Sequence, residues 1–282
     1  MKYIIIGGVA AGTSVAAKLR RNDENCDIVI YEKGDYISYS TCGMPYFIGR
    51  DEISAESLTP RDPAWFSKRF RIDIKTGCEV IDIAIDSQTV EIKNLESGEM
   101  FTDSYSELVL ATGSNAFIPP VPGTDLEHVF TLKTMDDTLA MDSFLQTRDV
   151  KSAVVIGAGF IGQEIFENLT ERGITVTLIE AKNSLMPVID DDMGIWIEDY
   201  FQNKGFQYFL GEFAEKIEPE NVITKSGKSF SADLVVLAAG VKPDTELAEK
   251  IGAELGETGG IKVDYEMNTS VAHVKAVGDC IE

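Results

Sequence analysis

The sequence contains no long apolar run and comparatively few basic residues. It has 25 lysine and arginine residues against 47 aspartate and glutamate residues, so its formal net charge is −22 at pH 7. A membrane-spanning helix needs about 20 consecutive apolar residues, so we expect a soluble protein with no membrane partner. A strongly negative surface repels phosphate backbones, which excludes nucleic acid as a partner and requires a local positive site for any anionic ligand.

Cysteine and histidine are also scarce. The two histidines, His128 and His273, stand in no recognisable catalytic context, which argues against a Ser-His-Asp or Cys-His hydrolase. The cysteines are spaced too widely and irregularly for a disulfide framework or a zinc site, so we expect no metal and a reducing, cytoplasmic location. They are Cys26, Cys42, Cys78 and Cys280.

A strand, a glycine turn and a helix occur in this order twice. The first copy is YIIIGGVAAGTSVAAKL and the second is AVVIGAGFIGQEIFENL. A second strand then ends on an acidic residue: Glu32 follows Gly12 by 20 residues, and Glu180 follows Gly162 by 18. This spacing is typical of the dinucleotide-binding unit and predicts an α/β protein with two Rossmann-like domains.

Each part of the turn has a physical role in binding a dinucleotide. Glycine allows the tight reversal and the close approach of a pyrophosphate, the helix N-terminus supplies amide donors and positive potential, and the acid accepts hydrogen bonds from a ribose. The second turn has all three glycines, Gly157, Gly159 and Gly162, whereas Val9 replaces the middle glycine of the first. The first motif is therefore the weaker one. For both, the alternative is a glycine turn that binds no ligand.

The domain layout follows from two further strands. SELVLATGS ends near Gly113 and ADLVVLAAGVKP passes Gly240, and both run into small-residue turns. The proline-rich FIPPVPG between them reads as a linker. A chain of 282 residues is long enough for two packed lobes. The opening MKYIIIGGVAAG breaks on glycines as a buried first strand does, so we read it as mature sequence rather than as a signal peptide. We predict a second domain inserted in a discontinuous first domain, with residues 1–113 and 241–282 in the first and residues 114–240 in the second.

Taken in order, these motifs resemble the flavin-dependent pyridine nucleotide-disulfide oxidoreductases. The resemblance includes A-T-G at residues 111–113 and V-G-D at residues 277–279. It implies that the first domain binds FAD, that the second binds NADH, and that Asp279 hydrogen-bonds the ribityl chain of the flavin. The cofactor-binding residues that it implies are Gly7, Gly8, Ala10, Ala11, Gly12, Glu32, Lys33, Cys42, Val80, Ala111, Thr112, Gly113, Gly157, Gly159, Phe160, Ile161, Gly162, Glu180, Gly240 and Asp279.

Two residues of the second unit bear on the nicotinamide cofactor. Glu180 would accept a hydrogen bond from a ribose 2′-hydroxyl and repel a 2′-phosphate, and Lys182 is the only cation nearby in sequence. We therefore expect NADH in preference to NADPH. Phe160 matches the aromatic residue that covers the flavin in this family until nicotinamide displaces it. Its alternative role is core packing.

The stretch YISYSTCGMPYF carries one cysteine, Cys42, without a second within reach. Dithiol members of the family carry C-x-x-x-x-C, and the position five after Cys42 is Phe47. The stretch is similar to the single-cysteine branch, in which the cysteine cycles between a thiolate and a mixed disulfide, a persulfide or a sulfenic acid. We expect a helix N-terminus just after Cys42 to favour its thiolate. The other three cysteines read as packing residues.

Within this branch the sequence resembles coenzyme A-disulfide reductases. The peroxidases and water-forming oxidases have a histidine where this chain has Ala10, which disfavours peroxide chemistry. The resemblance departs at Thr41, which replaces an asparagine, and at Phe70, where a basic residue is usual. Lys18, Arg20 and Arg21 form a basic cluster suited to phosphates. The positions that would hold coenzyme A are Ser14, Lys18, Arg21, Ser38 and Thr41.

The resemblance implies an FAD enzyme that passes hydride from NADH through the flavin to a small-molecule disulfide or persulfide, coenzyme A-linked, at Cys42. One alternative is an NADH oxidase or peroxidase that uses a cysteine sulfenic acid. Another, of a different class, is a non-catalytic FAD-binding fragment or redox sensor. The chain stops at GDCIE, where family members continue into a C-terminal dimerisation domain. We expect a homodimer for the longer form, and weak FAD retention and no family-type dimer for this chain.

Overall fold

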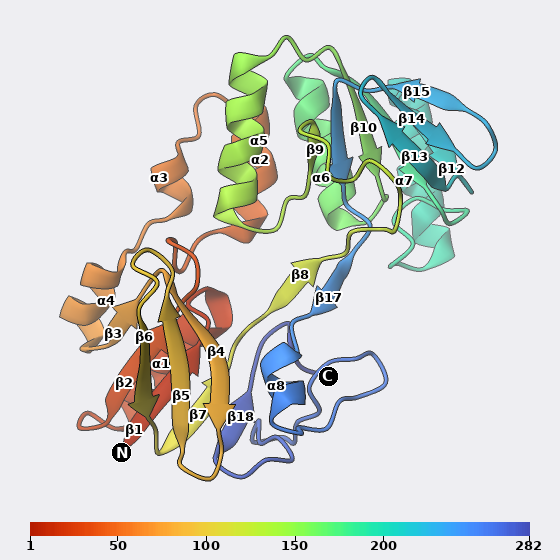
Figure 1. The fold of residues 1–282 in the computed structure, drawn as a ribbon. Coiled ribbons are helices and arrows are strands. Elements are labelled where there is room, and N and C mark those ends of the chain that lie inside the picture. The colour runs from red at the N-terminus through yellow and green to blue at the C-terminus, as the bar shows by residue number, and fades with distance from the viewer. The chain divides into compact units, whose positions relative to one another are not determined.

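The computed structural model describes residues 1–282, the side chain of residue 191 excepted. The chain forms two compact units. The first contains Met1–Tyr39, Thr59–Asn115 and Lys242–Glu282, and the second contains Ser40–Leu58 and Ala116–Val241. The chain passes between the units on either side of residues 40–58, and again at two short strands that pair with each other, β8 (Ser114–Ala116) and β17 (Val241–Pro243). The predicted fold, with two Rossmann-like domains and the second inserted in the first, is confirmed (Figure 1).

The first unit is built on a parallel sheet with strand order β18-β7-β1-β2-β3. Its three central strands, residues 2–6, 27–31 and 107–110, are short and largely apolar runs that are mostly buried, as parallel strands usually are, whereas the edge strand at residues 73–75 is partly exposed. The strands of the sheet are β1 (Lys2–Ile6), β2 (Asp27–Tyr31), β3 (Asp73–Lys75), β7 (Glu107–Leu110) and β18 (Val274–Ala276). The helices of the unit are α1 (Ala10–Asn22), α4 (Pro63–Phe70) and α8 (Glu246–Lys250).

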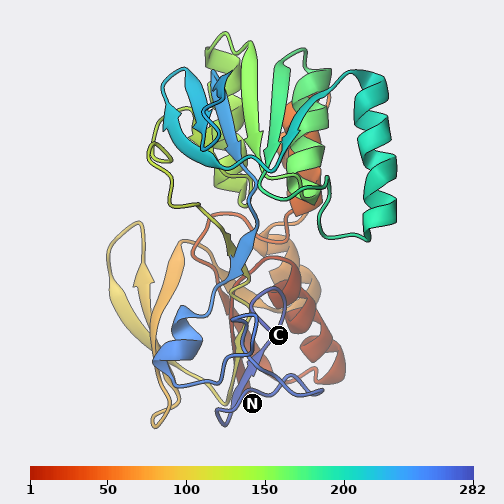
Figure 2. The same ribbon diagram turned by 90° about the vertical axis from the view of Figure 1, so that its right-hand side faces the viewer.

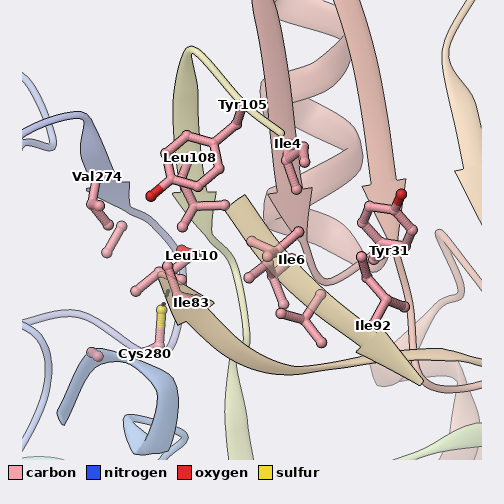
Figure 3. Close-up of a cluster of buried hydrophobic side chains, with 14 of the residues drawn as sticks. Ile4, Ile6, Tyr31, Ile83, Ile92, Tyr105, Leu108, Leu110, Val274 and Cys280 are labelled. Carbon is pink, nitrogen blue, oxygen red and sulfur yellow. Dashed lines mark hydrogen bonds between the residues drawn. The ribbon is translucent and has the colours of Figure 1, made fainter. Parts of the chain in front are cut away.

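Side chains of this sheet alternate between two cores. Ile5 packs with Ala16 of α1 on one face, whereas Ile4 and Ile6 point to the other, as the two-residue period of a strand requires. A three-stranded antiparallel sheet covers that other face, so the unit has three layers (Figure 2). Figure 3 shows how Ile83 and other residues of the antiparallel sheet meet the parallel strands. The antiparallel strands are β4 (Cys78–Ala84), β5 (Thr89–Asn94) and β6 (Met100–Ser104).

The second unit repeats this plan. A parallel sheet of order β12-β11-β10-β16-β9 is covered on one face by an antiparallel sheet and on the other by helices (Figure 1). Its parallel strands are β9 (Val129–Phe130), β10 (Ser152–Ile156), β11 (Thr175–Glu180), β12 (Gln207–Leu210) and β16 (Leu234–Leu237). The antiparallel strands are β13 (Ala214–Glu218), β14 (Asn221–Thr224) and β15 (Ser229–Ser231). The long helices are α5 (Met135–Thr147), α6 (Phe160–Glu171) and α7 (Asp191–Lys204). Among the described residues, no helix is long and apolar enough to cross a membrane.

The segment that carries Cys42 belongs to the second unit. It consists of a 3₁₀ turn, η1 (Thr41–Gly43), followed by α2 (Met44–Gly49) and α3 (Ala55–Leu58). The helix α2 packs against α6 and α5 (Figure 1), and its Met44 and Ile48 are buried. The predicted first domain, residues 1–113, includes this segment, whereas the contacts of the folded chain group it with the other unit. The assignment of FAD and NADH to the two domains stays a prediction.

Candidate functional site

The first glycine turn joins β1 to α1 and leaves no room for side chains. Gly7 has φ of +108°, and a Cβ there would lie 2.8 Å from the carbonyl carbon of Ala111. A Cβ at Gly12 would overlap the carbonyl oxygen of Gly7 and lie 3.0 Å from its carbon. Val9, the N-cap residue of α1, makes no capping hydrogen bond through its side chain. The backbone of this turn is therefore tightly packed, and the free amides of the first turn of α1 can donate hydrogen bonds to a phosphate.

The second glycine turn, between β10 and α6, repeats these contacts. Gly157 has φ of +109°, and its Cβ would lie 2.7 Å from the carbonyl carbon of Ala238. A Cβ at Gly162 would overlap the carbonyl oxygen of Gly157. Around Gly159, the N-cap of α6, no described atom apart from the local backbone and the two neighbouring residues lies within 4 Å of the Cβ position. This turn therefore has open space above the helix N-terminus, where a pyrophosphate can approach.

The two acids predicted to bind ribose also stabilise the glycine turns by accepting hydrogen bonds from backbone amides. Glu32 accepts hydrogen bonds from the Gly8 amide at 2.6 Å and the Gly34 amide at 2.8 Å. Glu180 accepts one from the Ala158 amide at 2.7 Å and one from the Lys182 amide at 2.8 Å. A carboxylate has about four acceptor positions, so each of the two carboxylates retains acceptor positions for a ligand. Each acid therefore lies beside its glycine turn, as the sequence predicts.

A polar cluster forms at the C-terminal end of β7. Ser114 Oγ donates to Asp279 Oδ2 at 3.2 Å, so the A-T-G and V-G-D motifs meet in the first unit. Thr112 Oγ1 donates to the Asp244 carbonyl oxygen at 2.6 Å, and Lys33 Nζ lies 3.7 Å from Asp244 Oδ2. No role for Ser114 or Asp244 follows from the sequence, because nothing in the local pattern links them to these motifs.

The other predicted cofactor residues lie in three kinds of place. Ala10 and Ala11 begin α1, and Ile161 lies in the first turn of α6. Gly240 has φ of +110° and accepts a hydrogen bond from the Phe117 amide at 2.9 Å. Val80 is only 6% exposed and its side chain lies in the hydrophobic core. A cofactor would therefore meet Val80 through its backbone.

Phe160 is exposed at the N-terminus of α6. Its exposed fraction is 61%, so core packing is not its role. It borders a pocket of about 410 Å³ between α6 and α7, with Glu164 and Trp196 also in the lining. Burial, and then the neighbouring Glu167, raise the pKa of Glu164. Phe160 is therefore accessible to a ligand at the glycine turn, and its place over the flavin stays a prediction.

Three of the five residues predicted to hold coenzyme A share a face of α1. Ser14, Lys18 and Arg21 are all exposed and follow the spacing of one helix face. Ser38 has φ of +50°, and its amide donates to the Gly8 carbonyl at 3.0 Å, which holds it at the first glycine turn. Thr41 lies in the second unit, where it is exposed beside Cys42.

Arg20 does not belong to the proposed basic cluster. It is only 8% exposed, and its guanidinium donates to the carbonyl oxygens of Phe70 at 2.8 Å and Arg71 at 2.9 Å. It ties α1 to the end of α4. The cluster is therefore reduced to Lys18 and Arg21.

Of the four cysteines, all of which the structure describes, only Cys42 is exposed. The exposed fractions of Cys26, Cys78 and Cys280 are 2%, 6% and 0%. Burial raises the pKa of the Cys78 thiol, which lowers its thiolate fraction and reactivity. The helix after Cys42, α2, has only six residues, with Pro45 in its first turn. Access therefore singles out Cys42 as the candidate reactive thiol.

Comparison with known proteins places these features in context. A family described as pyridine nucleotide-disulphide oxidoreductase matches residues 1–282. The chain is 36% identical over 287 residues to an NADH oxidase of Methanocaldococcus jannaschii and 35% identical over 280 residues to a coenzyme A disulfide reductase of Staphylococcus haemolyticus. These alignments cover 100% and 99% of this chain and 63% of each relative. A solved structure of an NAD-dependent persulfide reductase from A. fulgidus is 36% identical, with a TM-score of 0.95, over 100% of this chain and 53% of that one. The chain thus spans less than two thirds of these relatives.

Proposed function

Because the chain belongs to the pyridine nucleotide-disulphide oxidoreductase family, we propose that it reduces a disulfide or persulfide at Cys42 with electrons from NADH. FAD and NADH are the cofactors of these oxidoreductases. The observation that carries the proposal is the combination of two matching glycine turns with a single exposed cysteine. Two such turns suit two dinucleotides, and one exposed thiol suits one reacting sulfur.

Each glycine turn has a separate part in this proposal. Bound FAD would accept a hydride from NADH and deliver the two electrons to sulfur. Residues 1–113 and 241–282, apart from the Cys42 segment, would hold FAD through the α1 amides, with Glu32 at its ribose and Asp279 at its ribityl chain. Residues 114–240 would hold NADH through the α6 amides, with Glu180 at its ribose and Phe160 over the flavin until nicotinamide arrives.

Cys42 would act through thiol–disulfide exchange. Its thiolate attacks one sulfur of the substrate disulfide, forms a mixed disulfide and releases the other half as a thiolate. Two electrons then break the mixed disulfide, which releases the second thiol and restores the Cys42 thiolate. The balance is one NADH, one proton and one disulfide converted to NAD⁺ and two thiols.

Coenzyme A is the thiol carrier that we propose. The support is the pair of exposed cations, Lys18 and Arg21, on one face of an otherwise acidic protein, with Ser14 one turn before them. Cationic donors of this kind suit the phosphates of coenzyme A. A persulfide is the second form of substrate, because its outer sulfur can be transferred to the same thiolate. A cytoplasmic location follows from this chemistry, because the thiol must stay reduced.

The test is Cys42→Ser, with the flavin absorbance as the readout. We expect the variant with FAD bound to be bleached by NADH as fast as the unaltered protein, but not to be reoxidised by coenzyme A disulfide. Cys26→Ser is the matched control, because that buried thiol donates to a carbonyl oxygen, as a serine hydroxyl can. Disulfide turnover that survives Cys42→Ser would remove Cys42 from the mechanism. Intact mass of the isolated protein identifies the thiol carried on Cys42.

A second function, NADH oxidation by oxygen or peroxide, is favoured by the similarity to the Methanocaldococcus jannaschii NADH oxidase. Cys42 would then cycle through a sulfenic acid, and peroxide would replace the disulfide as oxidant. Comparing oxygen, peroxide and coenzyme A disulfide as acceptors on the same sample separates the two. Bound flavin that NADH does not bleach would support a sensor instead.

A further inference from the structure

The helix that follows Cys42 lies unusually close to α6. A Cβ at Gly49, the last residue of α2, would lie 2.5 Å from the Cβ of Asn168 in α6 and 2.8 Å from its carbonyl oxygen. Carbon atoms in contact are normally about 3.5–4.0 Å apart, so only glycine allows this approach. The backbone of α2 at Gly49 therefore lies directly against Asn168 of α6.

A buried amide forms the opposite side of this contact. Asn168 is 1% exposed, and its Nδ2 donates to the Glu164 carbonyl oxygen at 2.8 Å within α6. Its Oδ1 is buried with no hydrogen-bond partner among the described atoms, and it would lie 2.7 Å from a Cβ at Gly49. Since the side chain is held by its own helix, it cannot turn away to admit a larger residue.

Arg172 closes the contact from the end of α6. Its Nη1 donates to the carbonyl oxygen of Ile48 at 2.7 Å and lies 3.8 Å from Asp142 Oδ1. The side chains of Arg172 and Asp142 are only 22% and 16% exposed. A charged donor on a carbonyl at the end of a helix is stronger than a neutral one, so Arg172 holds the end of α2 against α6 and α5.

The contact is mechanically linked to the cysteine. Cys42 lies in η1, and the Met44 amide donates to the Thr41 carbonyl oxygen, so residues 41–49 form an almost continuous helical rod. A rod of this length spans about 12 Å at 1.5 Å per residue. The other partner, α6, begins at Gly159 and Phe160, the proposed NADH turn. The helix α6 therefore begins at the proposed NADH turn and, further along, contacts the helix α2 that follows Cys42.

We infer that Gly49, Asn168 and Arg172 are positioning residues, here called the α2 clamp, which set the place of the Cys42 sulfur from α6. The inference rests on the proposed thiol chemistry of Cys42. A methyl group at position 49 must push α2 outward by about 1 Å, and errors of that size cost up to about 100-fold in a reacting step. The clamp should therefore govern the thiol half of the reaction and leave hydride transfer from NADH unchanged.

The test compares Gly49→Ala and Arg172→Ala in the full chain with FAD bound. We expect reoxidation of the reduced flavin by coenzyme A disulfide to slow at least tenfold. We expect flavin reduction by NADH, and KM for NADH, to stay within twofold. Independently of turnover, alkylation of Cys42 by iodoacetamide, followed by peptide mass, should become at least threefold faster because η1 is held less firmly. Arg172→Lys, which can still donate to Ile48, should restore part of both effects.

Two control variants separate the clamp from general loss of stability. Arg50→Ala removes the exposed ion pair with Glu171, which joins the same two helices at 3.3 Å, and exposed pairs contribute little. Gly194→Ala adds a methyl group to α7, where the nearest described atom outside the local helix backbone and the two neighbouring residues is the Leu185 carbonyl oxygen at 3.3 Å. Both should match the unaltered protein within twofold.

The clamp and the proposed function fail in different ways. If the clamp variants match their controls in both alkylation and reoxidation, the clamp is refuted, whatever Cys42→Ser shows. If Cys42→Ser still turns over disulfide, the proposed thiol chemistry is wrong, and so is the clamp's role in it. If either alanine variant unfolds at the assay temperature, the other is compared with Arg172→Lys: a smaller loss in Arg172→Lys than in the alanine variant supports the inference, and equal rates in the two overturn it.

Discussion

Adding one methyl group to either of two glycines in the second turn should separate packing from ligand binding. At Gly162 the new Cβ overlaps the carbonyl oxygen of Gly157 and lies 3.0 Å from its carbonyl carbon. At Gly159 no described atom beyond the local backbone and the two neighbouring residues lies within 4 Å of the new Cβ, and the φ and ψ of −73° and −173° suit alanine. Gly162→Ala therefore strains the folded protein, whereas Gly159→Ala fills only the space above α6.

The magnitudes follow from these contacts. Overpacking costs about 1–3 kcal/mol. Because the new Cβ overlaps a backbone oxygen, which cannot move aside as a flexible side chain can, we take about 3 kcal/mol for Gly162→Ala. The higher helix propensity of alanine offsets about 1 kcal/mol of this cost, so the free energy of unfolding should fall by about 2 kcal/mol. For a unit of this size, that lowers the melting temperature by about 4–8 °C. Gly159→Ala should change the free energy of unfolding by less than about 1 kcal/mol.

The assay pairs differential scanning calorimetry with titration calorimetry of NADH into each variant. Gly159→Ala should keep its melting temperature but bind NADH at least tenfold more weakly, a loss of about 1.4 kcal/mol, because the methyl group occupies the space for the pyrophosphate. Unchanged NADH affinity in Gly159→Ala would refute the assignment of the dinucleotide to this turn. Unchanged melting of Gly162→Ala would refute the packing argument.

Two further predictions concern charge. The unaltered protein should bind NADH more tightly than NADPH. Glu180→Gln should reduce the ratio of the two dissociation constants by about tenfold, because it removes a negative charge beside the 2′-position of the ribose. Measuring the dissociation constants of both cofactors tests this, and a preference of the unaltered protein for NADPH would contradict it. Burial lowers the pKa of His128, so the stabilisation from keeping it neutral is present above about pH 6.5 and is lost as the pH falls below that value. The melting temperature should therefore fall from pH 7.5 to 5.5, and His128→Gln should flatten this dependence; equal slopes would show that other groups cause it.

The features that depend on neighbouring residues could be predicted from the sequence. The glycine turns, the strands before them and the acids after them lie within about 30 residues, where the βαβ connection fixes the geometry. Gly7 and Gly157 adopt nearly equal positive φ values, +108° and +109°, as the matching patterns led us to expect. The α/β fold, the insertion of one domain in the other and the family were all predicted from these local signals and are confirmed.

Features that depend on residues far apart in sequence became visible only in the folded structure. This structure placed the Cys42 segment with the second unit, because Gly49 allows α2 to touch α6 and Arg172 binds Ile48 across 124 positions. It took Arg20 out of the basic cluster, because its guanidinium is buried against the carbonyls of Phe70 and Arg71, about 50 positions away. It also brought Ser114 to Asp279, 165 positions later. Hydrophobic periodicity and turn patterns report only which face of its own element a residue occupies, whereas these contacts depend on which other element packs against that face.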